Sequence, residues 1–148
     1  MSGLAGVLAG RRPAGVYRWA SHARRADVAH AVEHAGWRFV GLDTVRVEDD
    51  AALVQEVAAA YGLDPSGGGP ERLGDLLAGV HHERGTVTLW EGWSPFARAE
   101  PSRFEAALGA FTRRSASLEG GEFVVLLRGD GPPLGLPDLD PHGRAQRA

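Results

Sequence analysis

Two short runs of almost entirely apolar residues constrain the fold more than any other feature of this sequence. They are residues 86–90 (TVTLW) and 123–127 (FVVLL), and both are rich in β-branched side chains. A strand with one buried face alternates apolar and polar residues, whereas a strand covered on both faces does not need to alternate. The two runs are therefore predicted to be central strands of a sheet that carries helices on both faces.

Glycine and proline divide the rest of the sequence into short apolar runs that alternate with longer amphipathic stretches. This alternation is typical of βα units. Residues 37–42 are predicted to form a third core strand, and residues 16–19 a possible fourth. The sequence therefore predicts an α/β fold in three layers, in which a small parallel sheet of three core strands, possibly extended by a fourth, lies between helices.

Three helices are predicted from apolar residues at helical spacing and from residues that favour helix ends. The first spans residues 27–35. The second begins at a cap formed by Asp49 or Asp50 and ends at Gly62. The third is predicted to be capped by Ser102. Its buried stripe is predicted to comprise Phe104, Ala107, Leu108 and Phe111.

The length of 148 residues suits a single domain, which is predicted to span residues 15–128. Residues 1–14 are expected to form a flexible N-terminal segment. Residues 129–148 are rich in proline and glycine and are expected to be a loosely ordered tail. Three apolar residues of the N-terminal segment could nevertheless dock as an amphipathic turn: Leu4, Val7 and Leu8.

Composition excludes several classes of protein. The chain has no cysteine, which excludes disulfide frameworks, thiolate metal sites and thiol enzymes and suits a reducing compartment. The longest uncharged run at the N-terminus is too short to span a bilayer and lacks the pattern of a signal peptide. The sequence therefore predicts a cytoplasmic protein that does not associate with membranes.

The net charge of −3 conceals a strong segregation of charge along the chain. Residues 1–42 have a balance of +4, residues 43–83 have a balance of −7, and residues 84–148 are balanced. A nucleic-acid-binding domain is usually basic, whereas an acidic segment attracts cationic partners. The sequence therefore predicts a basic protein partner and no direct contact with nucleic acid.

The histidines offer a weak signal for metal chemistry. His30, Glu33 and His34 satisfy HxxEH, a zinc-protease signature in which two histidines share one helix face. The chain offers no plausible third ligand, so solvated positions on a surface helix are the favoured interpretation. His81 and His82 are predicted to cap a helix end, where a cation complements the helix dipole. No metal site and no cofactor are predicted.

Signatures of catalysis are equally sparse. The chain contains no GxSxG nucleophile elbow. Residues 65–69 (PSGGG) lack the lysine of a phosphate-binding loop and lie in the most acidic part of the sequence. The protein is therefore not expected to be an enzyme, and a small hydrolase that uses the His30 and His34 pair is the most distant alternative.

One short segment combines a helix with an open acidic face. Pro70 suits the first helical position and Gly79 suits the helix exit. At about 100° per residue, the inward stripe comprises Leu73, Leu76, Leu77 and Val80. The residues predicted to point outward are Glu71, Gly74, Asp75 and Ala78. Small neighbours leave the two carboxylates of this face open to an approaching partner.

The order of these elements resembles that of the barstar-like family of intracellular ribonuclease inhibitors, over about residues 37–128. The most specific blocks are residues 86–93 (TVTLWEGW) and residues 73–77 (LGDLL). The second block matches the family pattern Leu-aromatic-Asp-x-Leu. The residues before this region look like the extension that longer family members carry. The resemblance implies a barstar-like fold for residues 15–128.

The resemblance also implies a function and a site. Asp75 falls on the aspartate that enters the active site of a ribonuclease, and Glu71 falls on a second acidic position of the same helix. The protein is therefore expected to be a toxin immunity protein, monomeric when free, that occludes a barnase-like basic ribonuclease. The predicted partner-binding residues are Ser66, Glu71, Gly74, Asp75 and Ala78.

The sequence departs from the family pattern at several of these positions. Family members carry aromatic residues in the loop before the helix and an aromatic residue immediately before the key aspartate. In this chain the loop is PSGGG and the residue before Asp75 is Gly74. Arg113 stands where the inhibitor has another acidic residue. An alternative prediction is therefore a divergent interaction or scaffold module that kept the fold and lost nuclease inhibition.

Overall fold

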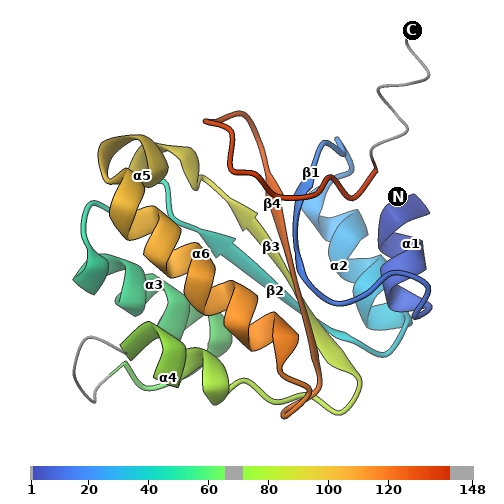
Figure 1. The fold of residues 1–148 in the computed structure, drawn as a ribbon. Coiled ribbons are helices and arrows are strands. Elements are labelled where there is room, and N and C mark those ends of the chain that lie inside the picture. Colours follow the sequence, from blue (N-terminus) through green and yellow to red (C-terminus); the bar gives the residue numbers. More distant parts are fainter. Residues whose placement is uncertain (1, 66–71, 141–148) are drawn as a thin grey trace, which may run out of the picture.

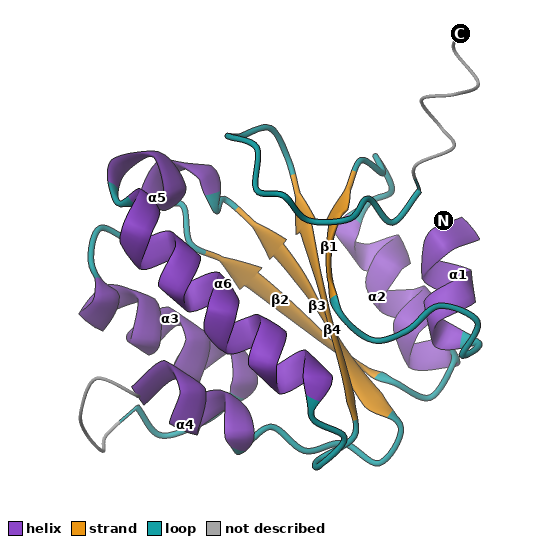
Figure 2. Cartoon of the chain, viewed as in Figure 1, coloured by secondary structure: helices purple, strands orange, loops and turns teal. Residues whose placement is uncertain are grey.

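Four parallel strands form the middle layer of the structure, and helices cover both faces of the sheet (Figures 1 and 2). The structure is a computed structural model, and it describes residues 2–65 and 72–140. The elements in chain order are α1 (Ser2–Leu8), β1 (Val16–Trp19), α2 (Arg25–His34), β2 (Arg38–Asp43), α3 (Asp50–Tyr61), α4 (Arg72–Ala78), β3 (Gly85–Glu91), α5 (Ser94–Ala99), α6 (Pro101–Ala116) and β4 (Glu122–Arg128). The predicted three-layer α/β architecture is confirmed.

The strand order is β1-β4-β3-β2, and every neighbouring pair is parallel. The two apolar runs of the sequence are β3 and β4, which lie side by side at the centre with Val87 opposite Val124. All residues of β3 except the last are buried, as expected for a strand covered on both faces. The possible fourth strand is β1, which pairs with β4 at one edge.

Two hydrophobic clusters hold the layers together. One lies between the sheet and the helices α3, α4, α5 and α6, and it includes Trp90, Phe111 and Phe123. The other lies between the sheet and the helices α1 and α2, and it includes Val28 and Leu126. Figure 1 shows the two groups of helices on opposite sides of the strands. Among the described residues, none of the helices has the length and apolar character needed to cross a bilayer.

The helix ends agree with the sequence prediction at α3 and differ from it at α6. Asp49 is the N-cap of α3 and accepts a hydrogen bond from the amide of Ala52 at 2.8 Å, and Gly62 ends the helix in the left-handed conformation. The predicted cap at Ser102 is wrong, because α6 begins one residue earlier at Pro101. Proline suits the first turn of a helix, because the N–H groups of that turn have no acceptor within the helix and proline has no N–H. The buried stripe of α6 is confirmed, whereas α5 was not predicted.

The N-terminal segment differs from the flexible segment that the sequence predicts. Helix α1 packs against the sheet side that also carries α2, and its Leu4, Val7 and Leu8 are buried. These are the three residues that could dock as an amphipathic turn. A helix of seven residues is unstable in isolation, and the burial of these three side chains in the second cluster holds it in place.

The first part of the C-terminal tail is also packed, in contrast to the loose tail that its prolines suggest. Leu139 is 1% exposed. The Asp140 carboxylate accepts hydrogen bonds from the amide of Gly3 at 2.7 Å and from the indole nitrogen of Trp19 at 3.0 Å. Asp138 forms an isolated bridge with Arg18 in β1. Residues 138–140 therefore pack against α1 and β1.

Candidate binding face on helix α4

Helix α4 lies in the connection between β2 and β3 and packs against α6 and α3. Leu77 of the predicted inward stripe is buried, while Leu73 and Leu76 are half-buried. Asp75 and Ala78 are exposed, as predicted. The structure therefore keeps one acidic side chain and a small neighbour on the open side of a packed helix.

The other predicted partner-binding residues are placed differently. Ser66 and Glu71 lie outside the described residues, as does Pro70 at the predicted helix start. Gly74 is half-buried rather than exposed, because it lines a groove between α4 and α6. A Cβ added at Gly74 would meet no atom within 4 Å, and Gly74 lines a second groove together with Ala78, so it lies on the open side of α4.

A buried arginine on α6 holds the C-terminal end of α4. Arg114 is 6% exposed. Its Nε donates to the carbonyl oxygen of Leu77 at 3.1 Å, and its Nη2 donates to that of Val80 at 2.9 Å. Further donations reach the carbonyl oxygens of Ser117 and Gly121 at 3.2–3.3 Å. The last carbonyl groups of a helix have no partner within the helix. The carbonyl oxygen of Leu77 accepts from the amide of Val80 as well as from Arg114, and Arg114 supplies the donor for Val80, just beyond the helix end.

Burial of the Arg114 guanidinium removes water from a charged group, and contacts with the surrounding residues offset this loss of solvation. Loss of solvent around the guanidinium lowers the pKa of Arg114 from its ordinary value. The group nevertheless stays charged, because a guanidinium is not deprotonated in proteins. It also lies over the ring of Phe123, 4.9 Å from the ring centroid, and a cation over an aromatic face is attracted to it. Arg114 therefore acts as a fixed anchor for α4.

Sequence reasoning missed this anchor, although the sequence carried a signal for it. Arg114 follows Phe111 by three residues and Ala107 by seven, so it falls on the buried stripe of α6. A charged residue on an apolar stripe indicates a buried group that needs partners. Which carbonyl oxygens it would reach depends on how α4 and α6 pack, which the sequence pattern does not define.

The carboxylates of the acidic central segment do not form one continuous negative surface. Asp49 caps α3, Asp43 accepts a hydrogen bond from the amide of Val45, and Asp50 lies 3.9 Å from the guanidinium of Arg103. These carboxylates have local structural roles. Asp75, by contrast, has no hydrogen bond or ion pair with any other residue that the structure describes. Glu48, Glu56 and Glu83 are also exposed, and Asp75 differs from them in lying on α4, the helix for which the sequence predicts an open acidic face.

The histidines have structural positions. His30 and His34 are exposed on α2, and their rings stack with 5.9 Å between centroids. Nδ1 of His82 accepts hydrogen bonds from the amides of Arg84 and Gly85 at 3.2 and 3.3 Å. His82 thus caps the turn into β3 and not the end of α4, where Arg114 takes the expected role. In residues 2–65 and 72–140, no three potential metal ligands come together.

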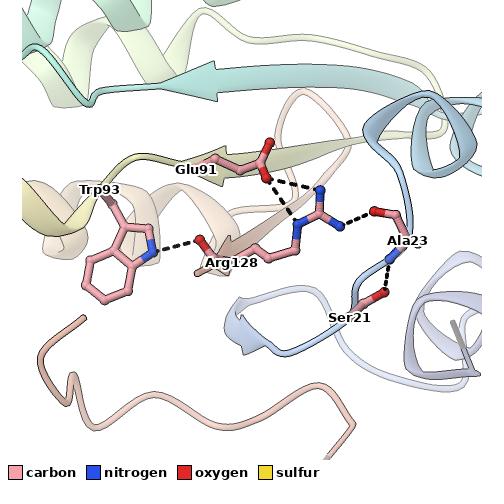
Figure 3. A network of polar contacts seen from close by, with 5 residues as sticks. All are labelled: Ser21, Ala23, Glu91, Trp93 and Arg128. Carbon is pink, nitrogen blue, oxygen red and sulfur yellow. Dashed lines mark hydrogen bonds and ion pairs between the residues drawn. The ribbon is translucent and has the colours of Figure 1, made fainter. Parts of the chain in front are cut away.

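A second polar cluster lies at the carboxyl ends of the strands, and Figure 3 shows its hydrogen bonds. Arg128 at the end of β4 is paired with Glu91 at the end of β3, with 3.0 Å between Nη2 and Oε2. Nη1 of Arg128 donates to the carbonyl oxygen of Ala23. The carbonyl oxygen of Arg128 accepts from the indole of Trp93 at 3.1 Å. Arg128 therefore ties together β4, β3 and the loop that leads from β1 to α2.

This cluster lines a crevice of about 800 Å³, and ligands of open parallel sheets commonly bind at this edge. Its two central side chains, Arg128 and Glu91, already neutralise each other. The guanidinium of Arg18 in the same crevice donates to the carbonyl oxygens of Gly129 and Pro132. These interactions hold the tail and the first loop in place, so the open face of α4 is the stronger candidate site.

Comparison with known proteins adds no further support for a particular function. The sequence matches no family model and no curated protein. The exposed Asp75, its small neighbour Ala78 and the Arg114 anchor are therefore the observations on which a functional proposal depends.

Proposed function

We propose that this chain is a barstar-like binding protein that inhibits a basic ribonuclease by covering its active site with helix α4. The observation that carries the proposal is the exposed carboxylate of Asp75 on a helix whose end is fixed by Arg114. The resemblance of residues 73–77 and 86–93 to the barstar-like family supports the same assignment. In this function the chain acts by binding in the cytoplasm and catalyses no reaction itself.

The physical basis is the replacement of a substrate phosphate by a carboxylate. A ribonuclease holds its phosphodiester substrate in a cationic cleft, and an inhibitor carboxylate placed there meets the same positive groups. Helices as short as the seven residues of α4 are unstable in isolation. Because Arg114 and the buried Leu77 order α4 before it meets a partner, less conformational entropy is lost on binding.

Asp75 is the anchor of the proposed complex. A carboxylate buried against cationic groups of a partner leaves those groups unpaired when it is removed, and this typically costs 2 to 5 kcal/mol. Removal of an exposed charge elsewhere on the surface mainly changes the rate of association. The Asp75→Asn variant should therefore lose inhibition, whereas Glu33→Gln on the opposite face of the sheet should retain it.

The test is a titration of the activity of a basic, barnase-like ribonuclease with the full chain and these two variants. Inhibition by the wild type that is weakened at least about thirtyfold in Asp75→Asn, with Glu33→Gln unchanged, supports the proposal. Equal inhibition by all three proteins contradicts the role of Asp75. No inhibition by the wild type contradicts the proposed function for this enzyme class.

A divergent interaction module that has lost inhibition is the second candidate, and a particular observation favours it. Gly74 places no side chain beside Asp75, and the groove next to it carries Arg72 and Arg113. A cationic cleft would be repelled by these guanidinium groups. A wild-type chain that binds the ribonuclease without reducing its activity would support this second candidate.

A further inference from the structure

The groove beside α4 is bounded by three helices and carries an unusual set of charges. It has a volume of about 490 Å³ and lies between α3, α4 and α6, which Figure 1 shows side by side on one face of the sheet. Its lining includes small residues such as Gly74, Ala106 and Ala110, so its floor is open to a ligand. Its charged residues are Arg72, Arg103, Arg113 and Asp50.

The three guanidinium groups of this groove are poorly satisfied. Arg113 is exposed and has no hydrogen bond or ion pair with the residues that the structure describes. Among the described residues, Arg72 makes one long hydrogen bond of 3.3 Å, to the carbonyl oxygen of Pro65, and its buried Nε has no acceptor. A buried N–H group without an acceptor is costly, so the described residues leave Arg72 incompletely paired.

Arg103 is only weakly neutralised by neighbouring carboxylates. It lies 3.9 Å from Asp50 and 3.8 Å from Glu100, and the side chains of all three residues are about half exposed. Exposed ion pairs with such separations contribute little to stability. Both carboxylates lie near Arg103, so Arg72 and Arg113 have no ion pair with any residue that the structure describes.

We propose that this groove binds a small ligand that carries phosphate or carboxylate groups, which pair with the arginines of its lining: Arg72, Arg103 and Arg113. Planar guanidinium groups match the oxygen geometry of phosphates and carboxylates and bind them through charge-assisted hydrogen bonds. The anion neutralises the excess positive charge of the groove, and its oxygen atoms supply acceptors that these arginines lack. The volume lies within the range of about 300 to 1,000 Å³ typical of small-molecule sites, which leaves room for the rest of the ligand.

This site is independent of the proposed inhibition of a ribonuclease. It requires only the described residues of α3, α4 and α6, and a small anion can be tested without any protein partner. Arg103 and Arg113 are exposed, so substitution of either residue should leave the fold intact. Arg98 on α5 is also exposed and does not line the groove. It therefore provides a control that removes the same charge from elsewhere on the surface.

The experiment is an NMR titration of the full ¹⁵N-labelled chain with inorganic pyrophosphate and, separately, with citrate, at constant ionic strength set with sodium chloride. Saturable shifts of the Gly74, Ala106 and Ala110 amide signals are expected. Tighter binding of pyrophosphate identifies a phosphate-bearing ligand class, and tighter binding of citrate identifies a carboxylate-bearing class.

The variants decide whether the groove is the site. The affinity should fall at least about tenfold in Arg113→Gln and in Arg103→Gln, and it should be unchanged in Arg98→Gln. The amide spectrum of each free variant shows whether it remains folded. The proposal is overturned if neither anion produces saturable shifts at these amides. It is also overturned if folded Arg113→Gln and Arg103→Gln bind as tightly as the wild type.

Discussion

Arg114 and Arg128 are both largely buried arginines that join distant parts of the chain, but they do so with different partners. Arg114 donates only to backbone carbonyl oxygens at the end of α4 and in the turn before β4. Arg128 is paired with a carboxylate, Glu91, which is 36% exposed, and reaches one carbonyl oxygen, that of Ala23. Backbone acceptors cannot be removed by mutation or protonated in the physiological range, whereas a carboxylate can.

The end of α4 and the carboxyl edge of the sheet therefore depend on their arginines to different degrees. At the carboxyl edge, backbone pairing of β1, β4 and β3 holds the structure in addition to Arg128. Helix α4 has no strand to pair with, and beyond the backbone hydrogen bonds of its last turn its C-terminal end is held by one guanidinium. The candidate binding face is therefore the region whose geometry is most sensitive to a single side chain.

The largest effect is expected for Arg114→Met. This change removes the donors to the carbonyl oxygens of Val80, Ser117 and Gly121, whereas that of Leu77 keeps the amide of Val80. Each unsatisfied group costs about 1 kcal/mol or more. The free energy of unfolding should fall by about 3 kcal/mol, and amide hydrogen exchange in α4 should accelerate more than in β3. Chemical denaturation and exchange measured by NMR test both effects.

The neighbouring residue gives a control for this prediction. Arg113→Met removes the same charge from an exposed position of α6 and should change stability by less than about 0.5 kcal/mol. If Arg113→Met and Arg114→Met destabilise the protein equally, the anchoring role of Arg114 is wrong.

A smaller effect is expected at the carboxyl edge. A double-mutant cycle with Arg128→Gln and Glu91→Gln should give a coupling energy of about 1 kcal/mol, because the pair is partly exposed. This coupling should weaken between low salt and about 1 M sodium chloride, at which screening extends to about 3 Å. The destabilisation caused by Arg114→Met should change much less with salt. Equal salt dependence at both sites would contradict the distinction between them.

The stability of the protein should also depend on pH above pH 10, because of the buried hydroxyl of Tyr61. The Tyr61 hydroxyl forms a hydrogen bond with that of Thr88, and burial raises the pKa of Tyr61 above its ordinary value of 10.0. The unfolded chain releases this proton above pH 10, whereas the folded chain retains it. The stabilisation is therefore present below pH 10 and is lost as the pH rises, by about 1 kcal/mol at pH 11.

Denaturation of the wild type and Tyr61→Phe at pH 8 and pH 11 tests this effect. The variant should be less stable at pH 8, because Thr88 loses its partner, and its further loss at pH 11 should be smaller than that of the wild type. An equal loss of stability in both proteins would assign the pH dependence to other groups.

The smallest effect is a gain in stability from Gly74→Ala. Gly74 lies within α4, and a Cβ added there meets no atom within 4 Å. Alanine is favoured over glycine within a helix by up to about 1 kcal/mol, so the melting temperature should rise by a few degrees. In Gly121→Ala the added Cβ would lie 2.1 Å from the carbonyl oxygen of His82, at a φ of +95°, and this control should be destabilised. A lower melting temperature for Gly74→Ala would contradict the open position of this glycine.

Local sequence patterns predicted the strands and most helices, because each depends on residues close together in the chain. The apolar runs of β3 and β4, the Asp49 cap and the Gly62 end of α3 are examples. The pattern also placed Asp75 and Ala78 on an exposed helix face. It failed at Ser102, where two neighbouring residues both suit a helix start and proline takes the first position.

The parts that the sequence could not predict depend on contacts between distant residues. The contacts of Asp140 with Gly3 and Trp19, and of Arg114 with Leu77, join segments whose approach is defined only by the packed fold. The half-burial of Gly74 likewise arises from the approach of α6 to α4. Charge counted along the chain predicted an acidic surface, but folding brought arginines of α6 beside the acidic segment.

The position of β1 has a consequence for the synthesis of the protein. This strand is synthesised before the other three, yet its sheet neighbour is β4, with Val16 opposite Val125. While the ribosome makes the intervening hundred or so residues, β1 has no place in the sheet, whereas β2, α3, α4 and β3 can already pack together. The apolar side chains of β1 and α1 therefore lack the cover of β4 until that strand has been synthesised. We expect nascent chains that stop before β4 to be the form of this protein most dependent on chaperones.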